Sequence, residues 1–157
     1  MKKFIYLAVA GILAVSCAAN KEVPAERQNY VQAAVGSREF KVDVIRVHPI
    51  TGPSVQLTSS YSLQVKGDSL YSHLPYYGRA YSVPYGGGSG LNFDGKLTDY
   101  QISRGKRGLT VVSFVAVSPD DRLEYTLEIF PDGNTTVNVQ PQNRQGIFFD
   151  GRMEMKE

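Results

Sequence analysis

The chain has 157 residues, with 17 lysine and arginine side chains against 15 aspartate and glutamate side chains. Residues 1–16 hold Lys2, Lys3 and no acidic residue, so the chain without them has 141 residues with 15 basic and 15 acidic side chains. Zero net charge excludes a generically basic binder of nucleic acid or another polyanion. The length fits one domain, large enough to bury a core without disulfides, and leaves no room for a second catalytic domain.

Residues 1–16 have the pattern of a lipoprotein signal peptide. The basic pair precedes an apolar run from Phe4 to Val15, which is too short to span a bilayer, and small residues lead directly to Cys17. Cys17 is the only cysteine, and its position predicts cleavage before it and attachment of a lipid to its thiol. The alternative is an ordinary secretory signal with an incidental cysteine. Residues 17–26 are short and polar, and we expect them to be a tether.

Residues 27–157 are predicted to form a single β-rich domain. Apolar positions from Pro24 to Val35 predict one short N-terminal helix that stops at Gly36. Beyond it, apolar and polar residues alternate, which is typical of strands with one solvated face. We expect strands at 40–47, 55–65, 70–74, 91–93, 99–104, 109–117, 123–129, 135–140 and 146–153, with tight turns at 66–69 and 131–134. Eight or nine strands without intervening helices indicate an all-β antiparallel meander, which forms either a barrel or a two-layer sandwich.

A segment rich in tyrosine and glycine interrupts the strands from Pro75 to Gly90. Seven of the ten tyrosines lie between Tyr61 and Tyr100. A segment of this length inside a compact domain is usually either functional or a packing lid. Tyrosine rings can stack on sugars or peptide side chains, and an arginine can hold a carboxylate or sulfate. In the alternative, the rings cover an open barrel end, with the arginine stacked between two of them. The predicted binding residues are Tyr76, Tyr77, Arg79, Tyr81 and Tyr85.

The same segment carries a family resemblance. The sequence LPYYGRAY at 74–81, followed by PYGGG at 84–88 and LNF at 91–93, resembles a family of uncharacterised Bacteroidetes cell-envelope proteins known only as a domain of unknown function. The likeness extends over nearly the whole chain after the signal, including residues 29–30, 57–61 and 143–145. It implies a secreted, usually lipid-anchored β-rich domain, and no catalytic residues come with it. The residues after Cys17 lack a clear acidic export run, so we expect the periplasmic face of the outer membrane rather than the cell surface.

The sequence shows no recognisable reaction chemistry. A zinc site needs three or four suitable ligands, and the chain has only His48 and His73, so no metal or cofactor is expected. Ser72 and His73 are adjacent on a predicted strand and point to opposite faces, so they cannot pair as nucleophile and base. His48 precedes a proline at a strand end and is expected at the surface. The acids at Asp120, Asp121 and Asp132 are expected to be solvated turn residues rather than calcium ligands.

Two classes of function stay open. In the first, the chain is a non-catalytic protein of the cell envelope, attached to the membrane by its N-terminal lipid, that binds a glycan, a peptide or a protein through the tyrosine and glycine segment. In the second, it is a hydrolase of envelope polymers whose site the sequence does not reveal. Ser69 is a candidate modification site, because Asp68-Ser69-Leu70 resembles the acid-hydroxyl-aliphatic signature of O-glycosylation in Bacteroidetes.

Overall fold

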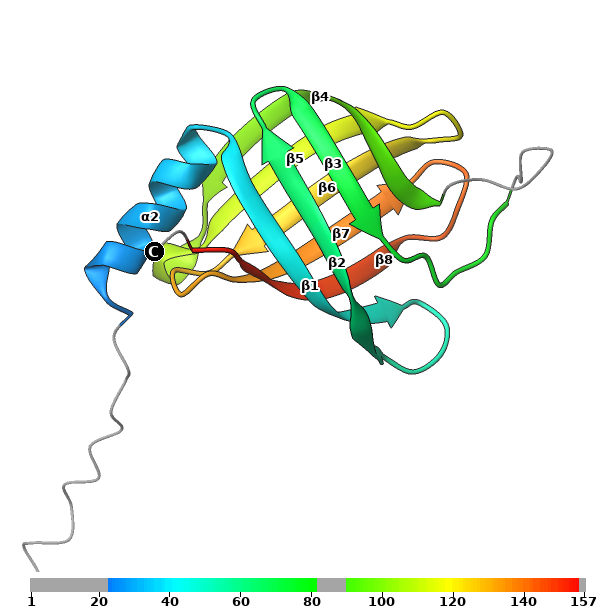
Figure 1. Cartoon of the computed structure of the whole chain (residues 1–157), viewed down its shortest axis with the longest axis horizontal. Helices are drawn as coiled ribbons and strands as arrows, with labels where there is room; N and C mark the ends of the chain where they lie inside the picture. Colours follow the sequence, from blue (N-terminus) through cyan, green and yellow to red (C-terminus); the bar gives the residue numbers. More distant parts are fainter. Residues whose placement is uncertain (1–22, 82–89, 156–157) are drawn as a thin grey trace, which may run out of the picture.

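A computed structural model describes residues 23–81 and 90–155. Within these residues, a helix is followed by eight antiparallel strands that close into a barrel (Figure 1). The elements are α2 (Ala25–Gly36), β1 (Glu39–Pro49), β2 (Val55–Lys66), β3 (Ser69–Leu74), β4 (Leu91–Arg104), β5 (Thr110–Val117), β6 (Arg122–Ile129), β7 (Asn134–Pro141) and β8 (Ile147–Met153), with a short 3-10 turn, Lys106–Gly108, between β4 and β5.

The barrel closes because β1 pairs with β8 as well as with β2. Val42 of β1 lies opposite Met153 of β8, and every other strand pairs with its neighbours in the chain. The alternation of apolar and polar residues puts one face of each strand inside. There Phe114 and Tyr125 stack with 5.1 Å between ring centroids, among valines, leucines and isoleucines that are almost wholly buried. The expected all-β meander is therefore confirmed, and its architecture is a barrel rather than a sandwich.

Strand β4 corrects the expectation of two separate strands at 91–93 and 99–104. The chain continues through Asp94-Gly95, which resembles a turn in the sequence, and Gly95 pairs with Leu70 of β3. A side chain at Gly95 would lie 3.2 Å from the carbonyl oxygen of Val117, so the glycine permits a close approach of backbone rather than a turn. A register shift between Thr98 and Gln101 then bends the strand.

Helix α2 covers one end of the barrel, which we call the helix end. It buries Val31, Ala34 and Val35 against the core, and the hydroxyl of Tyr100 donates to the carbonyl oxygen of Val35 at 2.9 Å. This confirms the predicted N-terminal helix. Among the residues that the structure describes, none forms a helix with the length and hydrophobicity needed to cross a membrane. The opposite end, the loop end, carries the β1–β2, β3–β4, β5–β6 and β7–β8 connections (Figure 1).

Candidate functional site

A groove of about 400 Å³ opens at the loop end, between the β1–β2 connection and the chain after β3. Its lining is mostly apolar, with prolines and a valine on one wall and a tyrosine ring on the other. Arg79 is the one charged residue among the described lining residues. Its guanidinium makes no ion pair or hydrogen bond with the other described lining residues. The lining residues are Pro49, Thr51, Gly52, Pro53, Val55, Tyr77, Gly78, Arg79 and Gln145.

The segment after β3 is held in place by the β7–β8 connection. The N–H of Gln145 donates to the carbonyl oxygen of Arg79 at 3.0 Å, and the side-chain oxygen of Gln145 accepts from the N–H of Arg79 at 3.2 Å. The N–H of Tyr81 donates to the carbonyl oxygen of Asn143 at 2.8 Å, and Ala80 forms an antiparallel bridge with Arg144. The backbone at Arg79, Ala80 and Tyr81 is therefore fixed, while the side chains of Arg79 and Tyr81 are exposed.

The tyrosines of this segment divide between packing and exposure. Tyr76 is half-buried, and its hydroxyl donates to the carbonyl oxygens of Arg79 at 3.1 Å and Gln145 at 3.0 Å; burial raises the pKa of this hydroxyl. Tyr77 and Tyr81 are 43% and 71% exposed, and the Arg79 side chain is also exposed. Tyr76 therefore supports the segment, whereas the other three side chains face solvent. Tyr85 lies outside the described residues.

Asp121 anchors the β7–β8 connection from below, so the expectation that it is a solvated turn acid is wrong. Its carboxylate is fully buried and accepts from the N–H groups of Gln142 and Asn143 at 3.1 Å. Arg144, also buried, places its Nε 3.8 Å from Asp121 Oδ2 and its guanidinium carbon 5.6 Å from the centre of the Tyr76 ring. The residue that stacks on a tyrosine here is therefore Arg144 and not Arg79.

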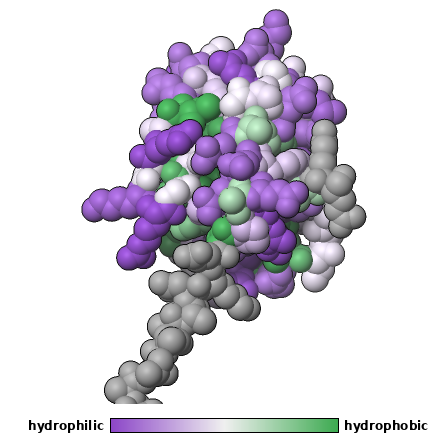
Figure 2. Space-filling model, turned by 90° about the vertical axis from the view of Figure 1, so that its left-hand side faces the viewer, coloured by the Kyte–Doolittle hydropathy of each residue, from purple (hydrophilic) through white to green (hydrophobic). Residues whose placement is uncertain are grey.

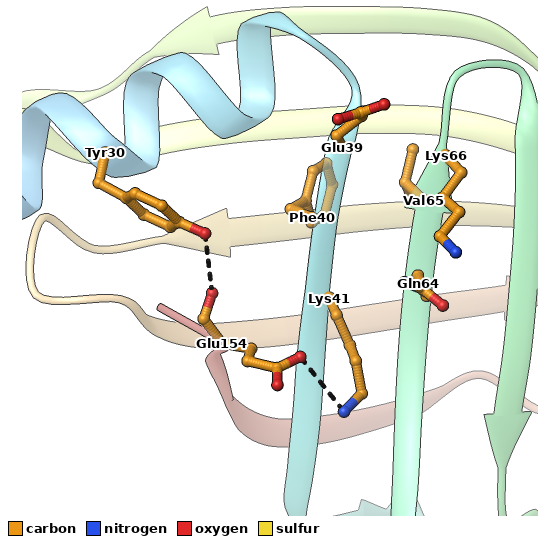
Figure 3. A pocket seen from close by; sticks show the side chains of 8 residues that line it. All are labelled: Tyr30, Glu39, Phe40, Lys41, Gln64, Val65, Lys66 and Glu154. Carbon is orange, nitrogen blue, oxygen red and sulfur yellow. Dashed lines mark hydrogen bonds and ion pairs between the residues drawn. The ribbon is translucent and has the colours of Figure 1, made fainter. Parts of the chain in front are cut away.

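A second hollow of about 420 Å³ lies at the helix end, between α2 and strands β1 and β2 (Figure 3). Its charges balance one another: Lys41 Nζ lies 2.9 Å from Asp43 and 3.3 Å from Glu154. The hydrogen bond to Asp43 raises the pKa of Lys41, against the opposite effect of burial. The surface seen from this end is mostly hydrophilic, with apolar residues in small separate groups (Figure 2). Because no described acid pairs with Arg79, the groove is the better candidate for ligand binding.

The remaining sequence candidates lie apart from the groove. Ser72 is buried and donates to the carbonyl oxygen of Leu91, whereas His73 is exposed and stacks on Tyr61, which confirms that the two point to opposite faces. Ser69 lies at the β2–β3 turn at the helix end, and Cys17 is outside the described residues. No group of three or more potential metal ligands occurs among the residues described.

Sequence reasoning missed the contacts of His48. This histidine is only partly exposed and bonds to Ser54 and to Asp150, which lies 102 residues away. A hairpin between the first two predicted strands could have suggested the contact with Ser54. The contact with Asp150 depends on the β1–β8 pairing that closes the barrel, and no local pattern reveals that pairing.

Comparison with known proteins supports the fold and the family. The chain is similar to the crystal structure of a DUF4251 family protein from Bacteroides eggerthii, with a TM-score of 0.62 and 24% identity over 82% of this chain and 87% of the other. At this identity the likeness shows the fold alone. No curated protein matches the chain. Residues 22–153 match the domain of unknown function DUF4251, and the chain therefore belongs to that family.

Proposed function

We propose that the chain is a binding protein of the cell envelope, held to the outer membrane by a lipid on Cys17, with its ligand in the loop-end groove. The anchor and the periplasmic location are supported by the sequence pattern of residues 1–17. The ligand is a glycan, a peptide or a segment of a partner protein. The described lining residues include no pair of acid and base, and the role proposed for this site is binding.

The observation that carries the proposal is Arg79 at the groove, exposed and without an acid beside it among the described residues. A guanidinium can hold a carboxylate through two parallel hydrogen bonds. The exposed ring of Tyr77 offers a flat face for a sugar ring or an apolar side chain. The chemistry therefore favours a ligand that combines an apolar or ring-shaped body with a carboxylate.

Preorganisation also supports binding at this place. Tyr76, Gln145 and Asn143 hold the backbone of the segment through hydrogen bonds, so little ordering is needed when a ligand arrives. A binding surface that is fixed in advance loses less conformational entropy on association. The groove thus has a rigid base and side chains that can adapt.

The test is titration calorimetry with two matched pairs of probes: oligosaccharides with and without uronic acid, and peptides with and without an acidic side chain. One of the two probe pairs is expected to bind. For the acidic member of that pair, Arg79→Gln should lower the affinity by about tenfold, which is typical of a lost charged hydrogen bond. Arg104→Gln, an exposed arginine at the helix end, is the matched control and leaves binding unchanged. Equal affinity of the wild type and Arg79→Gln for every probe would refute the proposal.

A further inference from the structure

Ser54, His48 and Asp150 form a chain of hydrogen bonds on the outer wall of the barrel, beside the β1–β2 hairpin. His48 Nδ1 lies 2.7 Å from the hydroxyl of Ser54, and His48 Nε2 lies 2.6 Å from Asp150 Oδ2. Both distances are hydrogen-bonding distances, short enough for a proton to pass from the hydroxyl to the imidazole. The three residues come from the connection after β1, from β1 itself and from β8.

The carboxylate determines which nitrogen of His48 acts as the base. An ionised carboxylate only accepts hydrogen bonds, so Asp150 selects the neutral tautomer that carries its proton on Nε2. Nδ1 is then an acceptor, and the partner that can donate to it is the hydroxyl of Ser54. Ser54, His48 and Asp150 thus have the roles of nucleophile, base and orienting acid in a catalytic triad. Compared with the usual serine triad, Nδ1 and Nε2 of the histidine have exchanged partners. Triads are recognised by geometry and roles rather than by sequence position.

The surroundings leave the serine open to a substrate. Ser54 is exposed, and the side chains of His48 and Asp150 are 34% and 48% exposed. The backbone N–H groups of Thr51 and Gly52, on the same connection, donate no hydrogen bond to any residue that the structure describes. Such N–H groups are the usual donors to the oxyanion of a tetrahedral intermediate. Phe148 lies opposite His48 in the β1–β8 pair and is 41% exposed, which provides an apolar neighbour for an acyl or alcohol group.

We propose that Ser54 and His48 are catalytic residues for the hydrolysis of esters with a small acyl group, and that Asp150 is the positioning residue of His48. Ser54 Oγ attacks the acyl carbon while its proton passes to His48 Nδ1. The bond to the leaving alcohol breaks, and the alcohol takes that proton. Water then attacks the acyl-serine with the same proton transfers, which releases the carboxylic acid and restores the serine. This site adjoins the groove, whose lining includes Thr51 and Gly52, and it gives named residues to the hydrolase class that the sequence left open.

The test is labelling of the full protein with a fluorophosphonate, which phosphonylates an activated serine and releases fluoride. We expect an adduct on Ser54, located by peptide mass spectrometry, and slow hydrolysis of 4-nitrophenyl acetate. Ser54→Ala abolishes the adduct, and His48→Gln slows labelling by about a hundredfold or more, the usual contribution of a general base. Ser60→Ala, which removes another exposed serine of the same hairpin, leaves labelling unchanged.

Asp150→Asn separates a positioning role from a purely structural one. The amide can donate to Nε2, which favours the tautomer with its proton on Nδ1, so Nδ1 no longer accepts from Ser54 and labelling slows as strongly as in His48→Gln. A folded Asp150→Glu keeps a carboxylate and should recover part of the labelling rate, whereas a purely structural role would lower the melting temperature without such a recovery. An unlabelled Ser54 in the folded wild type, or equal labelling rates in the wild type and a folded His48→Gln, would overturn the proposal. Neither result bears on ligand binding at Arg79.

Discussion

The two ends of the barrel are closed in different ways. At the helix end, α2 covers the core with apolar side chains, and Lys41 in the adjacent hollow is paired with two acids. At the loop end, hydrogen bonds and a buried ion pair hold a segment whose Tyr77, Arg79 and Tyr81 side chains are exposed, and no described acid pairs with Arg79. The helix end is therefore suited to stability, and in our proposal the loop end serves recognition. Substitutions at each end test that division.

The largest expected effect is at the base of the loop end. Asp121→Ala leaves Arg144 as a buried cation without a carboxylate, which typically costs about 3–5 kcal/mol. It also removes the acceptor for the N–H groups of Gln142 and Asn143. Urea unfolding should show the loss as a lower midpoint. Asp132→Ala, in a turn at the helix end where the acid accepts hydrogen bonds from Asn134, is the control and should cost no more than about 1 kcal/mol.

A smaller effect is expected from the apolar seal of the helix end. Val31 is 2% exposed, so Val31→Ala should lower the free energy of unfolding by about 1–3 kcal/mol through lost burial and a residual cavity. Asn29→Ala, on the exposed face of the same helix, should change it by less than about 0.5 kcal/mol. Affinity at the groove should be the same in both variants. A loss of affinity in Val31→Ala would show that the two ends are coupled.

Tyr76→Phe tests whether the fixed backbone matters for binding. The variant keeps the ring over Arg144 and removes the hydroxyl that joins the carbonyl oxygens of Arg79 and Gln145, at a cost of about 1 kcal/mol in stability. Affinity for the groove ligand should fall several-fold even though Tyr76 does not line the groove. Tyr77→Phe removes only an exposed hydroxyl and should leave the unfolding midpoint unchanged. Thermal melts and calorimetry on the two variants provide the comparison.

The smallest effect is confined to alkaline pH. Burial raises the pKa of Tyr100 to about 12, whereas a tyrosine in the unfolded chain titrates near pH 10. The unfolded chain therefore releases this proton first, so the stabilisation is complete below about pH 10 and is lost as the pH rises towards 12. Tyr100→Phe should flatten the fall in melting temperature over that range. Tyr71→Phe, at an exposed position, should leave the slope as in the wild type.

The sequence was sufficient for elements whose alternation reflects burial on one face. Val112, Phe114 and Ala116 of β5 are buried, as period two predicts, and the neighbouring positions are more exposed. It failed at Gly95, where glycine permits a close backbone approach within a strand and not a turn. The sequence could not distinguish a barrel from a sandwich. The contact that closes the barrel pairs Val42 with Met153, which lie at opposite ends of the domain's sequence.

At the candidate site, local pattern was a weaker guide. It identified the segment that lines the groove. It could not show that, of the two adjacent tyrosines, Tyr76 is half-buried and Tyr77 is exposed. Asp121 is buried because the β5–β6 turn meets the β7–β8 connection, a contact between parts of the chain about twenty residues apart. The His48 contacts were missed for the same reason. Side chains whose partners come from distant elements take their role from tertiary packing.

Closure of the barrel has a consequence for how the domain can meet other proteins. Because β1 pairs with β8, every strand of the barrel already has a hydrogen-bonded neighbour on both sides. Proteins with an unpaired strand edge can be joined there by another chain, in a specific complex or in an aggregate. Among the described residues, one-sided pairing occurs in stretches such as β2 before Ser62 and β4 after Leu97, which pair with β1 and β5 respectively. A partner that adds a strand would have to do so at such a stretch, and elsewhere on the wall it would meet side chains, which single substitutions can change.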